Sequence, residues 1–153
     1  SADDDGGFFR SRVAAYYRAE ALRLPRSTRG PRPERGRELP ARLEHAGRFT
    51  TRARVSRRVV RRGGSVTIRA AVRPTRSQRA LVSIEVYRGE RQVFQRYFDH
   101  AALWRGEARR FRARWSVPPG APRGRHAVRL GVFSVGFGKL RAWNASAGTV
   151  RVR

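Results

Sequence analysis

From residue 50 to the end of the chain, apolar and polar side chains alternate with a period of two. The alternation recurs in short runs at residues 52–55, 66–73, 82–86, 93–98, 111–117, 128–132 and 150–152. Turn-forming residues separate these runs, as at 62–65, 88–90 and 118–122. A period of two is typical of strands with one buried face. The pattern therefore predicts an all-β fold, an antiparallel immunoglobulin-like β-sandwich of about seven strands over residues 50–153.

The same alternation predicts which side chains face the core. Ile68, Val86, Phe111 and Leu130 occupy inward positions of four different runs. Replacing any of them with Asp is expected to prevent folding, because an unpaired buried charge costs several kcal/mol, on the order of the total stability.

The period changes near the N-terminus, where residues 8–24 have the spacing of an amphipathic helix. Large apolar side chains recur there at steps of three, four and seven: Phe9, Val13, Tyr16, Tyr17 and Leu24. Three aspartates precede the segment, where negative charge favours a helix start, and Pro25 ends it. Two interpretations stay open: the helix packs on this protein's own sheet, or it docks on a membrane surface or a partner, with Phe9, Tyr16 and Tyr17 as anchors.

Residues 25–48 contain four prolines and three glycines and almost no periodic apolar signal. Such a segment lacks the apolar content to fold alone and is typical of a linker or an arm that a partner orders. We therefore divide the chain into a helix and Pro/Arg-rich arm at 1–49 and a β-sandwich domain at 50–153. Removing residues 1–48 is expected to leave the sandwich folded but to abolish assembly with a partner.

The charge of the chain is strongly basic and unevenly placed. The 153 residues include 36 Lys and Arg against 11 Asp and Glu, for a net charge of +25 and a pI near 12.0. Residues 53–153 hold 24 basic and 4 acidic residues, so most of the charge lies on the predicted sandwich. A folded domain with this balance is expected to meet a polyanion or an acidic partner.

The chain has no cysteine and no methionine, and it starts with Ser1-Ala2-Asp3. A start on small residues followed by acids is typical of a mature protein after removal of a signal peptide, with Ser1 as the new N-terminus. We therefore expect an extracytoplasmic location, periplasmic or secreted. No apolar run reaches the length of a membrane-spanning helix.

Several segments of the predicted sandwich carry a familiar order of motifs. These are Gly-Gly-Ser-Val-Thr-Ile at 63–68, Val-Ser-Ile-Glu-Val-Tyr at 82–87, Val-Phe-Gln at 93–95, Phe-Arg-Ala-Arg-Trp-Ser-Val-Pro at 111–118, Val-Arg-Leu-Gly-Val-Phe-Ser at 128–134, Gly-Phe-Gly at 136–138 and Trp-Asn at 143–144. Residues 53–153 thereby resemble a β-sandwich, immunoglobulin-like accessory domain attached to secreted bacterial polysaccharide-degrading enzymes. The resemblance implies a secreted, non-catalytic module. Strand exteriors in that family are mostly Thr and Ser, whereas here many are Arg.

The residues offer little for catalysis. His45, His100 and His126 lie in three separate segments without metal-ligand spacing. The adjacent pair Asp99 and His100 is interpreted as turn residues. We therefore expect neither an enzyme nor a cofactor or bound metal.

The glycines at 136 and 138 predict a tight loop that folds Phe137 and Trp143 over one end of the sandwich. The two aromatic side chains are interpreted either as a structural lid or as a platform on which a sugar stacks.

Arginine supplies the candidate binding surface. In a sandwich of this kind the first, second and fifth strands share one sheet. Seven arginines would then point outward from that sheet: Arg52, Arg54, Arg69, Arg73, Arg110, Arg112 and Arg114. Adjacent guanidinium groups repel each other unless an anion bridges them, and arginine pairs bidentately with carboxylate or phosphate.

The sequence therefore favours a non-catalytic interaction module, an exported accessory or structural subunit that docks on an acidic protein surface or a larger assembly. Two alternatives remain: a module that binds an acidic polysaccharide, and a protein that binds nucleic acid. Against nucleic acid, the basic runs contain no recognised binding motif and no interleaved aromatics on which bases would stack.

Overall fold

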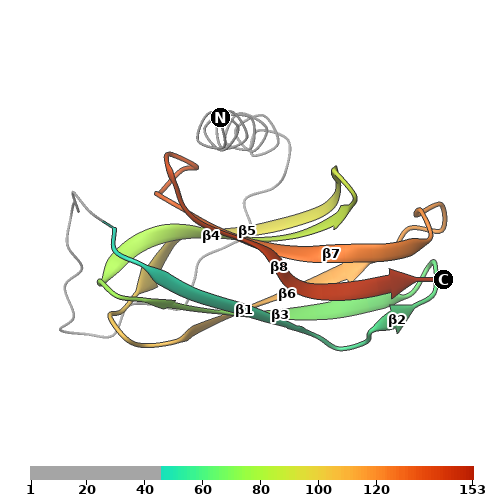
Figure 1. Ribbon diagram of the computed structural model, residues 1–153, viewed down its shortest axis with the longest axis horizontal. Helices are drawn as coiled ribbons and strands as arrows, with labels where there is room; N and C mark the ends of the chain where they lie inside the picture. Colours follow the sequence, from blue (N-terminus) through green and yellow to red (C-terminus); the bar gives the residue numbers. More distant parts are fainter. Residues whose placement is uncertain (1–45) are drawn as a thin grey trace.

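The computed structural model describes residues 46–153, which form two β-sheets packed face to face (Figure 1). The predicted N-terminal helix with Phe9, Tyr16 and Tyr17, most of the predicted arm, and His45 lie outside the described residues. Residues 46–153 contain no helix, so none of their elements is a helix that could cross a membrane.

Eight strands make up the domain. They are β1 (Phe49–Val55), β2 (Val59–Val60), β3 (Ser65–Pro74), β4 (Gln78–Arg88), β5 (Arg91–Leu103), β6 (Arg109–Ser116), β7 (Gly124–Phe133) and β8 (Leu140–Val152). One sheet has the order β1-β3-β6 and the other the order β2-β8-β7-β4-β5 (Figure 1). All pairs are antiparallel except the short β2–β8 pair, which is parallel. The predicted all-β, two-sheet fold is confirmed, as is the placing of the first, second and fifth predicted strands in one sheet.

The core lies between the sheets and is built from the inward members of the alternating runs. Ile68, Val86 and Leu130 are fully buried there, and Phe111 is 5% exposed. On β3 and β6, buried residues alternate without interruption with exposed or half-buried ones over Val66–Arg73 and Arg110–Ser116, since only one face of this sheet is covered. The inward face that the sequence predicts is thus confirmed at these four positions.

Hydrogen bonds from side chains connect the two sheets along both sides. Asn144 of β8 donates hydrogen bonds from Nδ2 to the backbone oxygen (3.2 Å) and the hydroxyl (3.0 Å) of Thr51 on β1. On the other side, Arg109 of β6 donates from Nη1 to the carbonyl of Ala102 on β5 at 2.6 Å. The outer face of the β1-β3-β6 sheet forms a surface three strands wide.

Most strands extend beyond the runs of alternation, and β4 and β8 show why. Strand β4 begins at Gln78, and β8 begins at Leu140, so Trp143 belongs to a strand rather than to a loop. In β4 nearly every residue is buried on both faces, which removes the alternating signal. In β8, residues 140–149 are half-buried or exposed and include small side chains, so no period stands out there either.

Candidate anion-binding face

The outer face of the β1-β3-β6 sheet carries the seven arginines that the sequence placed there. All are exposed: Arg52, Arg54, Arg69, Arg73, Arg110, Arg112 and Arg114. The structure therefore brings the predicted residues together on one surface, which we call the arginine face. Their role in binding stays a prediction.

The register aligns three of these side chains in one row across the sheet. Arg54 is the cross-strand partner of Arg69, and Arg69 is the partner of Arg112. Neighbouring strands lie about 4.8 Å apart, so the three side chains start at that spacing. Like charges placed directly opposite each other destabilise a sheet.

No acidic residue stands on these three strands to offset the repulsion. Strands β1, β3 and β6 contain no Asp or Glu at all. Along each strand, outward positions recur every second residue, about 7 Å apart. A partner lying on the arginine face therefore meets guanidinium groups both across the strands and along each strand.

A hollow of about 150 Å³ opens at one end of the arginine face. Its lining residues are Thr50 and Arg52 of β1, Ala71 and Arg73 of β3, and Ala108 just before β6. Thr50 is the cross-strand partner of Arg73, and Arg52 is the partner of Ala71. The two arginines thus lie diagonally across the hollow, and the two alanines leave the space between them unfilled. Sequence reasoning found the arginines but missed Thr50, Ala71 and Ala108, although the period of two had already put Thr50 and Ala71 on this face.

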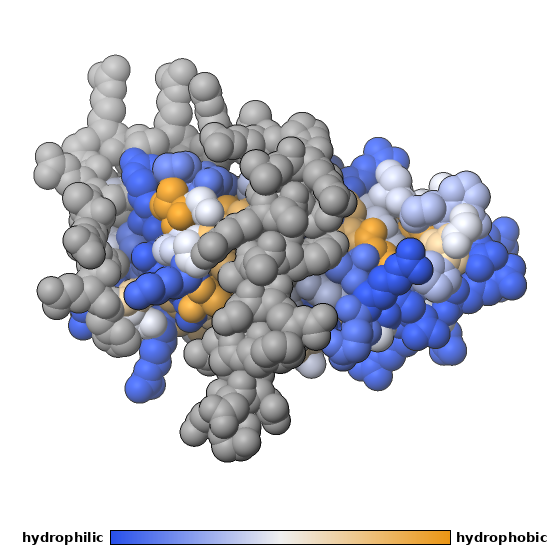
Figure 2. Space-filling model, turned by 90° about the horizontal axis from the view of Figure 1, so that it is seen from above, coloured by the Kyte–Doolittle hydropathy of each residue, from blue (hydrophilic) through white to orange (hydrophobic). Residues whose placement is uncertain are grey.

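The opposite surface of the domain, the outer side of the five-stranded sheet, has a different character. In the space-filling view of that side, apolar residues form patches among hydrophilic ones (Figure 2). A second apolar cluster lies here, separate from the main core, and consists of Leu81, Tyr97, Phe133 and Phe137 with Leu140 and Trp143 packed against it.

The aromatic residues that the sequence singled out belong to this cluster. Phe137 is 2% exposed and sits in a left-handed backbone conformation (φ 57°) in the β7–β8 loop. Its ring meets those of Tyr97 and Phe133 edge-on, at centroid distances of 5.0 and 5.3 Å. Trp143 is half-buried and meets Tyr87 edge-on at 6.3 Å. This packing agrees with the structural-lid interpretation, over a sheet face rather than a sandwich end; sugar stacking by Phe137 and Trp143 stays an untested prediction.

A buried carboxyl group lies on the same side of the sheet. Glu85 of β4 is 0% exposed, and its Oε1 accepts hydrogen bonds from the Tyr87 hydroxyl (2.7 Å) and from Gln92 Nε2 (3.2 Å). Its Oε2 has no hydrogen-bond partner. Burial raises the pKa of Glu85 well above 4.5, and the two hydrogen bonds and the charge of Arg129 offset only part of that effect.

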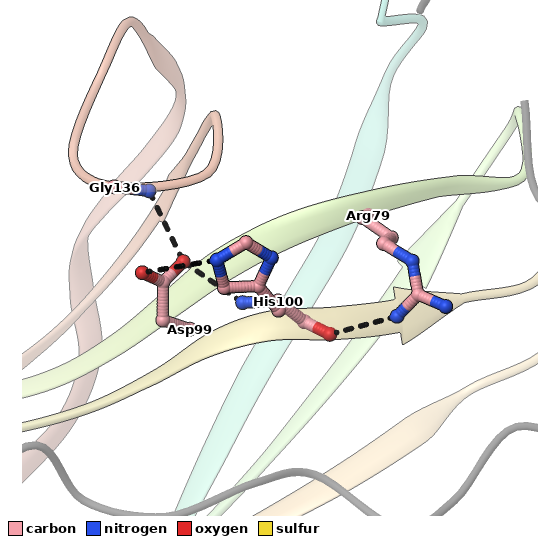
Figure 3. A network of polar contacts seen from close by, with 4 residues as sticks. All are labelled: Arg79, Asp99, His100 and Gly136. Atoms are coloured by element: carbon pink, nitrogen blue, oxygen red, sulfur yellow. Dashed lines mark hydrogen bonds and ion pairs between the residues drawn. The ribbon is translucent and has the colours of Figure 1, made fainter. Parts of the chain in front are cut away.

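The pair Asp99 and His100 has a structural place inside β5. At this point one residue of β4 faces two of β5, and His100 adopts a φ of 53°. These are the features of a β-bulge, so the expectation of turn residues is corrected to a bulge within a strand. Asp99 Oδ1 accepts hydrogen bonds from the backbone N–H of His100 (2.8 Å) and of Gly136 (3.1 Å), and Arg79 donates to the His100 carbonyl (Figure 3). The carboxylate thereby ties the β7–β8 loop to β5.

His126, the other histidine within the described residues, also makes structural contacts. His126 is buried, its Nδ1 is hydrogen-bonded to the Gly124 carbonyl at 2.9 Å, and its ring lies against Trp115. Burial is the main cause that lowers the pKa of His126 below 6.5. Within residues 46–153, no three His, Cys, Asp or Glu side chains gather in a way that could hold a metal ion.

Comparisons with known proteins define the class of the domain by its fold. The C-terminal domain of Wzt is similar to this chain with a TM-score of 0.55 at 9% sequence identity, covering 70% of this chain and 74% of that domain. An alkylpurine DNA glycosylase, AlkC of Pseudomonas fluorescens, bound to DNA with an abasic site analog, has a TM-score of 0.50 at 14% identity, covering 70% of this chain but 31% of the glycosylase. A β-glucosidase from Erythrobacter marinus has a TM-score of 0.47 at 11% identity and is covered over 15% of its length.

At 9% and 14% identity, the likeness to the first two structures shows a shared fold and no more. No protein-family model matches the chain, and no curated protein sequence matches it. The likeness therefore assigns no function to the chain, and the immunoglobulin-like accessory domain that the sequence resembles is taken up below as a proposal.

Proposed function

We propose that this chain is a non-catalytic interaction module that docks on an acidic partner through the arginine face of its three-stranded sheet. The observation that carries the proposal is the row of Arg54, Arg69 and Arg112, aligned across three strands that hold no acid. We further propose an immunoglobulin-like sandwich, in keeping with the motif resemblance, and an extracytoplasmic accessory or structural role.

The energetics of the row support a binding role. Each like-charged cross-strand pair lowers the stability of the unbound protein by an amount on the order of 0.2–1 kcal/mol. An anion placed between two guanidinium groups reverses the sign of that interaction, because each arginine then forms charge-assisted hydrogen bonds. A surface of this kind is therefore more stable in the complex than in the free protein.

The proposal of a non-catalytic role rests on what the polar groups of the described part do. Asp99 holds a loop, His126 packs in the interior, and Glu85 is enclosed among Tyr87 and Gln92. None of these groups lies on the arginine face, so the candidate surface supplies positive charge, hydroxyl groups and hydrogen-bond donors but no carboxylate or imidazole that could act as a general base.

The test compares two variants of equal net charge. One carries Arg54→Gln, Arg69→Gln and Arg112→Gln on the arginine face. The other carries Arg91→Gln, Arg123→Gln and Arg151→Gln at exposed sites off that sheet. Binding to polyglutamate, polygalacturonate and duplex DNA is measured by affinity electrophoresis at about 0.2 M salt, where non-specific attraction is weakened.

We expect the first variant to lose at least tenfold in affinity for the polyanion that the wild-type protein prefers, and the second to lose less than threefold. Equal losses in both variants would show that binding follows overall charge, and the arginine face would then not be the docking surface.

A further inference from the structure

We propose that the hollow at the end of the arginine face is a subsite for one carboxylate group of an acidic polysaccharide. The inference rests on the proposed function and names the class of partner. It concerns Thr50, Arg52, Ala71, Arg73 and Ala108, which line the hollow.

The lining of the hollow matches the chemistry of a sugar carboxylate. Arg52 and Arg73 lie diagonally across it and bring two guanidinium forks, which pair bidentately with planar carboxylates. The Thr50 hydroxyl both donates and accepts hydrogen bonds, so it suits a hydroxyl next to the carboxylate on a sugar ring. The methyl groups of Ala71 and Ala108 contribute no polar atom and leave room for the group to enter.

The size of the hollow limits the size of the group that it can bind. Pockets that enclose a whole small molecule measure about 300–1,000 Å³. A hollow of about 150 Å³ is smaller than that range, so it holds a charged substituent while the rest of the ligand stays outside. The ligand would continue over the adjoining row of Arg54, Arg69 and Arg112, which extends the same face.

The outer face favours a hydrophilic polymer over a protein partner. Its outward residues on β1, β3 and β6 are arginine, threonine, serine and alanine, without one aromatic or large aliphatic side chain. Protein–protein interfaces have an apolar centre with aromatic anchors, which this face does not offer.

The face also differs from surfaces that bind nucleic acid. Single-stranded nucleic acids are held by aromatic platforms for the bases, and most duplex readers insert a helix or ribbon into a groove. The arginine face presents neither a stacking ring nor a protruding element on its three strands. A polymer that carries one carboxylate on each sugar unit can pair with the guanidinium groups of this face. Its binding requires neither a stacking ring nor a protruding element.

The experiment fills the hollow without changing charge. Ala71→Ile places a branched side chain on its floor, at a half-buried strand position that accepts such residues. Ser116→Ile adds similar bulk at the opposite end of the same sheet, at an exposed position, and serves as the matched control. Both full-length proteins and the wild type are titrated with polygalacturonate and with its fully methyl-esterified, uncharged form, and circular dichroism confirms that each protein is folded.

We expect the wild type to bind polygalacturonate and not the methyl ester, Ala71→Ile to bind at least tenfold more weakly, and Ser116→Ile to bind within twofold of the wild type. Unchanged affinity of Ala71→Ile would refute the subsite while leaving the arginine face as a docking surface. Preference for polyglutamate or duplex DNA over polygalacturonate at about 0.2 M salt would refute the polysaccharide and still leave that surface intact. Only equal loss in the two triple-glutamine variants would remove the proposed function itself.

Discussion

Glu85 is the residue whose environment departs furthest from what its sequence position suggests. The alternation of β4 places it on the side of the sheet away from the core, where a glutamate is ordinarily solvated. Here it is fully buried, and burial raises its pKa well above 4.5. Above pH 4.5 the unfolded chain therefore releases the proton while the folded chain retains it. Stability is lost as the pH rises from 4.5 through the folded-state pKa.

The first prediction follows from the loss of stability with rising pH. Replacing Glu85→Gln removes the titrating group, so the variant should gain stability relative to the wild type as the pH rises from about 4 to 8. Urea unfolding at several pH values measures the difference. Glu90→Gln makes the same side-chain substitution at an exposed turn residue and is measured beside it as the control. A pH-independent difference in stability between Glu85→Gln and the wild type would mean that the Glu85 carboxyl group is solvated in the folded protein.

Residue-scale reasoning from the sequence succeeded where one face of a strand is exposed. All seven arginines were placed correctly on one surface, because a period of two fixes which side chains share a side of β1, β3 and β6. It did not find the burial of Glu85, because no local pattern tells which outer face of a sandwich is covered. The hollow was also missed, since it depends on the register that sets Thr50 opposite Arg73.

At the scale of elements, the cross-strand register places arginines of different strands directly opposite one another, so their charges interact. Arg69 has an arginine opposite it on both neighbouring strands, Arg54 on β1 and Arg112 on β6. Arg69→Thr removes both like-charged pairs and introduces a residue that favours strands. The free protein should gain about 0.2–1 kcal/mol of stability for each pair removed, a gain that shrinks as salt screens the repulsion.

Thermal unfolding at low and high salt tests this second prediction. Arg114→Thr on β6 removes one positive charge at an exposed position whose cross-strand partner is Thr67 rather than an arginine, and it is the control. If Arg69→Thr is destabilising at low salt, the guanidinium groups of this row do not repel one another. They would then make favourable contacts in the free protein, and the energetic argument for an anionic partner would fail.

Element boundaries could be predicted only where burial differs between the two faces. The run at 111–117 matched β6 within two residues, because Phe111, Ala113 and Trp115 are buried between exposed arginines. Strand β8 was recognised only at its end, where Val150 and Val152 enter the core. Its earlier half serves a different purpose, since Asn144 bonds to Thr51 and joins the two sheets. A single polar side chain of that kind leaves no periodic signal.

At the scale of the whole molecule, the question is what the described domain needs from the rest of the chain. All eight strands and the main core lie within residues 46–153. The cut expected from the sequence, after residue 48, would remove groups that the domain uses. Gln78 Nε2 donates to the Ala46 carbonyl at 2.6 Å, and Arg48 and Thr75 exchange two hydrogen bonds of 2.8 and 2.9 Å. The better boundary therefore lies before residue 46.

The last prediction is that a chain of residues 46–153 folds on its own. The fragment keeps the full set of strand pairs, so far-UV circular dichroism should show a β spectrum, and heating should give one cooperative transition. It also keeps the whole arginine face, so its affinity for the preferred polyanion should stay within about threefold of the full chain. A second fragment, 49–153, lacks the contacts of Ala46 and Arg48 and should be less stable by about 1–3 kcal/mol, the net contribution of the hydrogen bonds lost. If 46–153 shows no cooperative transition while the full chain does, segment 1–45 is an integral part of the fold rather than an appended arm.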